Sequence, residues 1–139
     1  MSTNSMVGFV REDGSVVASY VHYDGYETGV GGTLLEHYNS SELAERVASA
    51  GYFSSLSGDM EESLSKSVHT ERSDEFNDFN EYRDFAEENS HLEFCYLWVS
   101  GRWIYSTWTT RVEGIGRFAE YSSTWNGFAE LIPAYVREG

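Results

Sequence analysis

The chain has 139 residues, of which 40% are hydrophobic and 16% aromatic, and its formal net charge is −14. This length and apolar content predict a single folded domain over residues 1–139, and no apolar run approaches the roughly 20 residues of a membrane-spanning helix. The excess of acidic residues disfavours direct contact with nucleic acid or with an anionic membrane, because both carry negative charge themselves.

Cysteine usage and the start of the chain indicate an intracellular protein. The single cysteine, Cys95, cannot form an internal disulfide, and it lies in an apolar strand pattern that favours a place in the core. The first six residues lack the basic and apolar blocks of a signal peptide. We therefore expect a protein of the cytoplasm.

Two β-rich runs, at residues 6–11 and 15–22, predict a hairpin early in the chain. Glu12-Asp13-Gly14 lies between them, and Asp-Gly favours a type I′ turn, whose two central residues both need positive φ. Farther along, Thr33 and Glu36 have the spacing of a capping box, in which the two side chains accept backbone hydrogen bonds at a helix start. This pattern predicts a helix that begins at Thr33.

The middle of the chain predicts two further helices. One begins near Ser40 or Ser41 and ends at Gly51. The other spans residues 76–89 and is amphipathic, with apolar residues on one side and carboxylates on the other. Residues 58–73 are rich in serine and glutamate and have little periodicity, so we expect an exposed loop there. The apolar faces carry Leu43, Ala44, Val47 and Ala48 in the first helix, and Phe79, Tyr82 and Ala86 in the second.

Residues 92–108 predict a second hairpin, which turns at Ser100-Gly101. A two-residue turn there pairs aromatic side chains across the strands, and each pair contributes on the order of 0.2–1 kcal/mol. Both faces of this hairpin are largely apolar, so we expect it near the centre of a sheet. The aromatic pairs are Trp98 with Trp103 and Tyr96 with Tyr105.

The end of the chain predicts a helix that is capped by Ser123 or Thr124 and runs through Val136, although Pro133 weakens its middle. Together these elements predict an α+β domain. Its antiparallel sheet has about four or five strands, formed by the two hairpins, and two or three helices pack on one face of the sheet.

The most unusual segment runs from Tyr20 to Tyr38 and reads Y-V-H-Y-D-G-Y-E-T-G-V-G-G-T-L-L-E-H-Y. It combines two histidines, an aspartate, four glycines and four tyrosines between a strand-like run and the start of a helix. Ordinary core packing does not call for that combination. We therefore expect this segment to be a place where a ligand, a metal or a partner is bound.

This segment resembles a motif of small uncharacterised phage and prophage proteins, whose usual form is Y-x-H-W-D-G-Y-P followed by G-V-G, a leucine pair and a tyrosine. Two positions differ, because Tyr23 stands in place of the usual Trp and Glu27 in place of the usual Pro. The resemblance ends at Thr109. It implies a phage or prophage origin and expression in the host cytoplasm, and it implies no particular reaction. The matching residues are His22, Asp24, Gly25, Tyr26, Gly29, Val30, Gly31, Leu34, Leu35 and Tyr38.

Metal binding is one chemistry that the motif allows. On a strand, His22 and Asp24 would face the same way, and His37 could approach from the following helix. Two imidazoles and a carboxylate form a suitable set of ligands for a divalent metal. The interpretation that we favour is simpler: His22 and Asp24 hydrogen-bond to loop amides and shape the turn at Gly25, and Tyr26 covers them.

Binding of a small ligand is the second alternative. The glycine run at residues 29–32 leads into the expected helix, so its amides and the positive helix end could hold a phosphate or a carboxylate. The run matches neither a P-loop nor a complete dinucleotide fingerprint, and a need for positive φ angles is the explanation that we favour. An anion would also need Arg46 or Arg102 to fold over the site. The ligand-binding set is His22, Asp24, Tyr26, Gly29, Gly31, Gly32 and Thr33.

The third candidate is the acidic middle of the chain. From Asp59 to Glu93 there are twelve acidic residues and three basic ones, so this segment carries most of the net negative charge. Carboxylates three or four positions apart on a helix lie about 5–6 Å from one another, broadly comparable to phosphates along nucleic acid. Such a face could occupy the basic groove of a nuclease, polymerase or defence complex, although an ordinary solvated face has the same pattern. The partner-binding set is Asp74, Glu75, Asp78, Glu81, Asp84, Glu87 and Glu88, with Tyr82 as an anchor beside them.

The leading hypothesis is a phage-encoded acidic protein that inhibits a host protein by binding its basic surface. We expect no cofactor and no enzyme activity, because the serines form no G-x-S-x-G elbow and paired carboxylates such as Glu61 and Glu62 are adjacent, so they do not face each other on a helix. The alternatives are a small-ligand binder, such as a sponge for a nucleotide signal, and a metal-dependent hydrolase built on His22, Asp24 and His37. The sequence also allows a homodimer.

Overall fold

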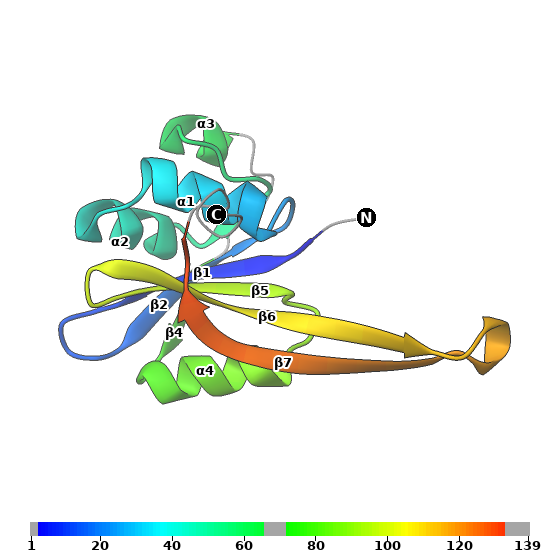
Figure 1. Cartoon of the computed structure of the whole chain (residues 1–139). Helices are drawn as coiled ribbons and strands as arrows, with labels where there is room; N and C mark the ends of the chain where they lie inside the picture. The colour runs from blue at the N-terminus through cyan, green and yellow to red at the C-terminus, as the bar shows by residue number, and fades with distance from the viewer. Residues whose placement is uncertain (1–2, 66–71, 133–139) are drawn as a thin grey trace.

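A twisted β-sheet with helices on both faces organises the chain. The computed structural model describes residues 3–65 and 72–132. Figure 1 shows α1, α2 and α3 on one side of the sheet and α4 on the other. The helices are α1 (Gly32–His37), α2 (Ser41–Ser49), α3 (Met60–Ser65) and α4 (Phe79–Glu88), and a π-helical turn, η1 (Glu27–Gly31), precedes α1.

Seven strands form this sheet within the described residues, in the order β3-β2-β1-β5-β6-β7, and β4 also pairs with β2. The β1/β5 and β2/β3 pairs are parallel, and the other pairs are antiparallel. The strands are β1 (Ser5–Val10), β2 (Val16–Val21), β3 (Tyr52–Phe53), β4 (Asp74–Phe76), β5 (Phe94–Val99), β6 (Arg102–Glu113) and β7 (Glu120–Glu130).

The predicted α+β class is confirmed, but the predicted antiparallel sheet of four or five strands with helices on one face is wrong. The sheet is mixed because β1 lies parallel to β5, which places Ser5 beside Phe94. A pairing between segments so far apart in the chain has no local sequence signal. The two short strands β3 and β4 pair with the free edge of β2. They are strands because of this backbone pairing, and their amino-acid composition does not predict them.

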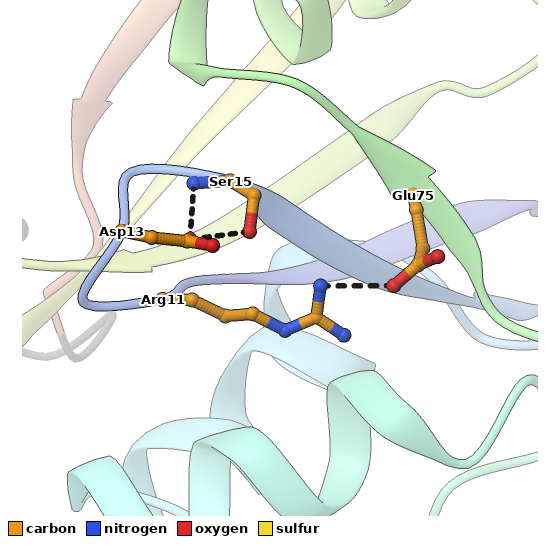
Figure 2. A network of polar contacts seen from close by, with 4 residues as sticks. All are labelled: Arg11, Asp13, Ser15 and Glu75. Carbon is orange, nitrogen blue, oxygen red and sulfur yellow. Dashed lines mark hydrogen bonds and ion pairs between the residues drawn. The ribbon is translucent and has the colours of Figure 1, made fainter.

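The first hairpin is confirmed, but its predicted type I′ turn is wrong. Arg11 and Ser15 close a three-residue loop: the Arg11 N–H donates to Ser15 O at 2.8 Å and the Gly14 N–H donates to Arg11 O at 2.9 Å. Within this turn only Gly14 has a positive φ, of 89°. Figure 2 shows that the Asp13 carboxylate accepts hydrogen bonds from the Ser15 N–H and hydroxyl, at 2.9 and 2.6 Å. The loop is therefore a type I turn followed by a left-handed glycine.

The second hairpin has the predicted register. Ser100 and Gly101 have φ values of 54° and 78°, as a type I′ turn requires. Trp98 lies opposite Trp103, and their ring centroids are 5.4 Å apart. The Tyr96–Tyr105 pair is also confirmed, with ring centroids 6.0 Å apart. Its first strand, β5, lies between β1 and β6, so the predicted central position is confirmed.

The predicted C-terminal helix is wrong over the residues that the structure describes, and its remainder from 133 to 136 lies outside them. Ser123 and Thr124, the proposed caps, lie in β7 opposite Thr110 and Thr109. Residues 121–125 read Y-S-S-T-W, and their tyrosine, threonine and tryptophan are residue types that favour strands, so pairing with β6 overrides the capping signal.

The helices of the middle segment follow the sequence in part. α2 is confirmed, with Ser40 as its cap, Ala44 and Val47 fully buried, and a positive φ of 102° at Gly51. α4 begins at Phe79, because residues 74–76 form β4 instead of the predicted helix start. The exposed loop predicted at 58–73 is wrong over α3, since Met60 and Ser63 are buried there. Residues 66–71 lie outside the described part.

The capping box at Thr33 is also wrong. The chain is already helical from Glu27, and Gly31 and Gly32 both have right-handed helical φ and ψ angles. Thr33 therefore lies inside the helical segment, where the backbone N–H groups that a cap would satisfy are no longer at a helix start. A helix that begins as a π-helical turn has no capping signature in the sequence.

Side chains pack on both sides of the sheet. One core cluster lies on the side of α1 and α2 and includes Leu34, Val47, Tyr96 and Trp103. The other lies on the side of α4 and includes Tyr82, Ala86, Cys95 and Leu97. The alternation of Tyr96 and Leu97 between the two clusters explains why both faces of the second hairpin are apolar.

Candidate functional site

The outer face of α4 displays the predicted carboxylates. Asp78 caps the helix, because its side chain accepts a hydrogen bond from the Glu81 N–H at 2.9 Å. Tyr82 and Ala86 point into the core, and at 100° per residue the residues on the opposite side form the solvent-facing stripe. All residues of this stripe are exposed. We call them the α4 acidic face: Glu81, Asp84, Glu87 and Glu88.

Arginines of the same chain neutralise only part of the negative charge of the predicted partner-binding carboxylates. The Arg11 guanidinium lies 2.9 Å from the Glu75 carboxylate, as Figure 2 shows, and Arg83 lies 3.6 Å from Asp84. Even with both cations included, the seven predicted carboxylates keep a negative net charge. Both ion pairs are exposed, so they contribute at most about 1 kcal/mol and a partner can compete for these carboxylates.

Tyr82 is not available as a partner anchor, and this part of the predicted site is wrong. Its side chain is fully buried, and its hydroxyl donates to the Tyr96 carbonyl oxygen at 2.8 Å. Burial also raises the pKa of the phenol well above its usual value. The helical period of 76–89 already placed Tyr82 on the apolar side, which is the signal that it belongs to the core.

The Tyr20-to-Tyr38 motif forms a loop that is held by hydrogen bonds within itself and to neighbouring segments. Because β2 ends at Val21, His22 and Asp24 are not strand neighbours, and Asp24 has a positive φ of 58°. A ring nitrogen of His22 lies 3.0 Å from the Tyr20 hydroxyl, and the Tyr26 hydroxyl donates to Asp24 at 3.2 Å. The side chains of His22 and Asp24 thus contact tyrosine hydroxyls, and the predicted hydrogen bonds of these side chains to amides of the described loop are not formed.

The residues proposed as metal ligands are not assembled. Within residues 3–65 and 72–132, no group of three His, Cys, Asp or Glu side chains lies close enough to hold a metal ion. His37 instead packs beside Gly58, where an added methyl group would lie 2.7 Å from the imidazole ring. The proposed combination of His22, Asp24 and His37 therefore has no support from the geometry.

Gly25 and Gly29 of the motif serve close packing and not positive φ. Gly29, Gly31 and Gly32 all lie outside the set of positive-φ glycines, so that explanation is wrong. Gly25 lies against the chain start: its N–H donates to Thr3 O at 2.9 Å, and its own carbonyl accepts from the buried Tyr96 hydroxyl at 2.7 Å. Gly29 packs against the Asp24 carbonyl oxygen. A side chain at either position would collide with backbone.

The start of the helical segment is a poor place for an anion. Glu27 lies in its first turn, and the Glu27 carboxylate accepts a hydrogen bond from the Tyr105 hydroxyl at 2.7 Å. Arg102, which an anion site would need, lies 3.7 Å from Glu130. Arg46 lines a separate shallow groove beside His37 and residues 58–61. Negative charge therefore already occupies the helix end that would attract a phosphate.

A pair of glycine substitutions tests this structural role. In Gly25→Ala, the new Cβ would lie 2.7 Å from Thr3 O and 2.8 Å from the Ser5 Cβ, so we expect a loss of about 1–3 kcal/mol of unfolding free energy. In the control Gly32→Ala, the nearest atom is 3.9 Å away and the backbone is helical, so we expect a gain of roughly 0.5–1 kcal/mol. Urea unfolding followed by circular dichroism measures both. Equal effects of the two substitutions would refute the close approach at Gly25.

One exposed feature was missed by the sequence analysis. Large apolar side chains with little cover lie along and beyond the outer part of β6 and β7. The period-2 pattern of residues 108–112 and 121–125 indicates Val112 and Tyr121 once the second segment is taken as a strand, and Ile115 and Phe118 lie outside this pattern. The exposed side chains are Val112, Ile115, Phe118 and Tyr121.

No family model, no curated protein and no solved structure matches the chain. The candidate site therefore rests on the geometry of the chain itself. Within the described part of the chain, no helix combines the length and the apolar character that a membrane crossing requires.

Proposed function

We propose that this chain is a non-enzymatic acidic protein that binds a basic host protein and blocks it. The observation that carries the proposal is the α4 acidic face, where four exposed carboxylates lie on the solvent side of a helix whose opposite side is anchored in the core. A rigid helix holds these charges in a fixed spacing of about 5–6 Å. Asp74 and Glu75 extend the negative surface onto β4.

The chemistry of the partner follows from this surface. A groove lined with Lys and Arg, such as one that normally holds nucleic acid, is electrostatically complementary to a row of carboxylates. Occupation of the groove would exclude its substrate, so the chain would act as a nucleic-acid mimic without any reaction of its own. The resemblance of the Tyr20-to-Tyr38 motif to phage and prophage proteins motivates a host target in the cytoplasm, in host takeover or in defence against phage.

A four-site neutralisation tests the proposal. We expect the combined variant Glu81→Gln, Asp84→Asn, Glu87→Gln and Glu88→Gln to slow association with the basic partner by about 10- to 1000-fold at low salt, because the steering charge is lost. The matched control neutralises four exposed carboxylates on the other side of the sheet. The control variant combines Glu36→Gln, Glu42→Gln, Glu45→Gln and Glu61→Gln.

The measurement has two stages. Tagged wild type and both variants are used to capture proteins from host lysate at low and high ionic strength, and the captured protein is then titrated in a fluorescence-anisotropy assay of its nucleic-acid binding. We expect wild type and control to capture one basic protein in a salt-sensitive way and to displace its nucleic acid. If the α4 variant captured the partner and displaced its nucleic acid as well as wild type does, the proposed role of the α4 acidic face would be wrong.

A further inference from the structure

Residues Trp108 to Trp125 form an arm. The last pairing of β5 with β6 is at Thr107, and beyond it β6 pairs with β7 alone. Figure 1 shows this two-stranded ribbon extending away from the rest of the molecule and past α4, with a short helical turn at its tip, η2 (Gly116–Phe118). A two-stranded ribbon on its own is at best marginally stable in water, so the arm needs a surface to pack on.

The two faces of the arm differ in chemistry, because side chains alternate along each strand. One face is mostly apolar and continues the side on which Phe128 and Trp125 pack against the α4 core cluster. The other face is polar. Cross-strand pairs on the apolar face are Trp108–Trp125, Thr110–Ser123 and Val112–Tyr121, and those on the polar face are Thr109–Thr124, Arg111–Ser122 and Glu113–Glu120.

The apolar face of the arm lacks the cover that α4 gives to the rest of the sheet. Val112 is 53% exposed and Tyr121 is 73% exposed, and at the tip Ile115 and Phe118 reach 89% and 75%. Exposed apolar side chains that lie close together on a folded protein mark a surface on which another molecule docks.

The charge of the arm favours a second copy of the chain over a basic partner as the molecule that covers it. The arm contains two arginines and two glutamates, so it is neutral in a chain whose net charge is −14. A basic partner gains no electrostatic attraction from this surface. A second copy of the chain, in contrast, meets strong repulsion at the acidic surfaces and none at the arm.

We propose that the arms of two copies pack apolar face to apolar face, antiparallel, about a twofold axis near the Val112–Tyr121 pair. Each tip, with Ile115 and Phe118, then lies over the partner's Trp108–Trp125 pair. Packed sheet faces lie about 10 Å apart, so the second arm occupies the layer that α4 occupies over the body. α4 and the second arm together cover this face of β6 and β7, and the contact uses the same residues of both copies.

Sedimentation velocity tests the dimer directly. We expect the wild-type chain to sediment as a dimer at micromolar concentration. Val112→Asp places a charge in the contact and is expected to raise the dimer dissociation constant by roughly 100-fold or more. Ser122→Asp adds the same charge on the polar face of the same arm and is expected to leave the dissociation constant within about threefold. A monomeric wild type, or equal effects of the two substitutions, would overturn the proposal.

Chemical cross-linking tests the arrangement without adding charge. Val112→Cys places a thiol near the twofold axis, whereas Arg111→Cys places one on the opposite face. Cys95 is buried and its pKa is raised to about 12, so it stays unreactive. With a bismaleimide of about 10 Å span, the sheet-packing distance, we expect a covalent dimer from Val112→Cys and only background from Arg111→Cys. Equal yields from the two variants would refute face-to-face packing.

The dependence on ionic strength distinguishes the contact between two arms from partner binding at the α4 acidic face. Because the arms are neutral and apolar, added salt only screens the repulsion between the two bodies, so the dimer should be as strong or stronger at high ionic strength. A dimer that dissociates steeply with salt would contradict an apolar contact. A wild-type chain that is monomeric but still captures the basic partner would overturn this inference and leave the proposed function standing.

Discussion

Replacement of Tyr82 by alanine is expected to lower the free energy of unfolding by about 3–5 kcal/mol, the range of buried aromatic truncations. The ring is fully buried, with its centroid 5.1 Å from that of Phe76 and 6.2 Å from that of Phe128. It also lies over Gly8, where an added Cβ would be 3.2 Å from the ring. Tyr82 therefore joins α4 to the sheet, and its removal leaves a cavity between them.

Two companion substitutions separate packing from hydrogen bonding. Tyr82→Phe keeps the ring and loses only the bond to the Tyr96 carbonyl, so we expect a loss of about 1 kcal/mol. Asn80→Ala, on the exposed side of the same helix, should change stability by less than about 0.5 kcal/mol. Urea denaturation gives all three values. A loss below about 1 kcal/mol in Tyr82→Ala would place the ring outside the core, contrary to the structure.

The second large effect is a loss of stability at alkaline pH. Burial raises the pKa of Cys95 from 9.0 to about 12, and burial also raises the pKa values of Tyr82 and Tyr96 above their usual range. In the unfolded chain these groups lose their protons first, so above pH 9 the unfolded state binds fewer protons than the folded state. Stability from Cys95 is therefore full below about pH 9 and is lost as the pH rises toward 12.

Cys95→Ala isolates the contribution of the thiol. For one proton, the free energy of unfolding falls by about 1.4 kcal/mol per pH unit between the two pKa values. We expect wild type to show this slope in addition to the slope of the buried tyrosines, and Cys95→Ala to be less steep by that amount between pH 9.5 and 11. Urea unfolding at several pH values measures the slope independently of any constant loss from the smaller side chain. Identical slopes would show that the thiol ionises equally in both states.

Short-range sequence patterns predicted the helices and turns whose structure depends mainly on residues close to them in the chain. The two-residue turn at Ser100-Gly101 fixes the register of the strands on either side of it, so the Trp98–Trp103 pairing was predictable. The helix from Ser41 was predictable because its cap and its apolar period agree. In the candidate site, the exposed carboxylates of α4 followed from the same period. The same period places Tyr82 in the core, which argues against its predicted role as a partner contact.

The motif from Tyr20 to Tyr38 shows where residue types alone mislead. Residue types alone predict positive-φ glycines or an anion-binding loop there, but the chain is helical from Glu27. The need for glycine arises from Thr3 and from the Asp24 carbonyl, both of which are brought close by the fold. A steric requirement set by another segment leaves no trace in the local pattern.

The sequence by itself determined the charge of this protein, its two hairpins, and the helix that displays its carboxylates, because each depends on composition or on a short-range period. Tertiary structure alone decided that β1 pairs with β5, that α4 covers the face opposite the other helices, and that residues 120–125 pair with β6 to form the arm. Those outcomes depend on backbone pairing between distant segments, whose free energy is shared over many residues and is encoded at no single one of them.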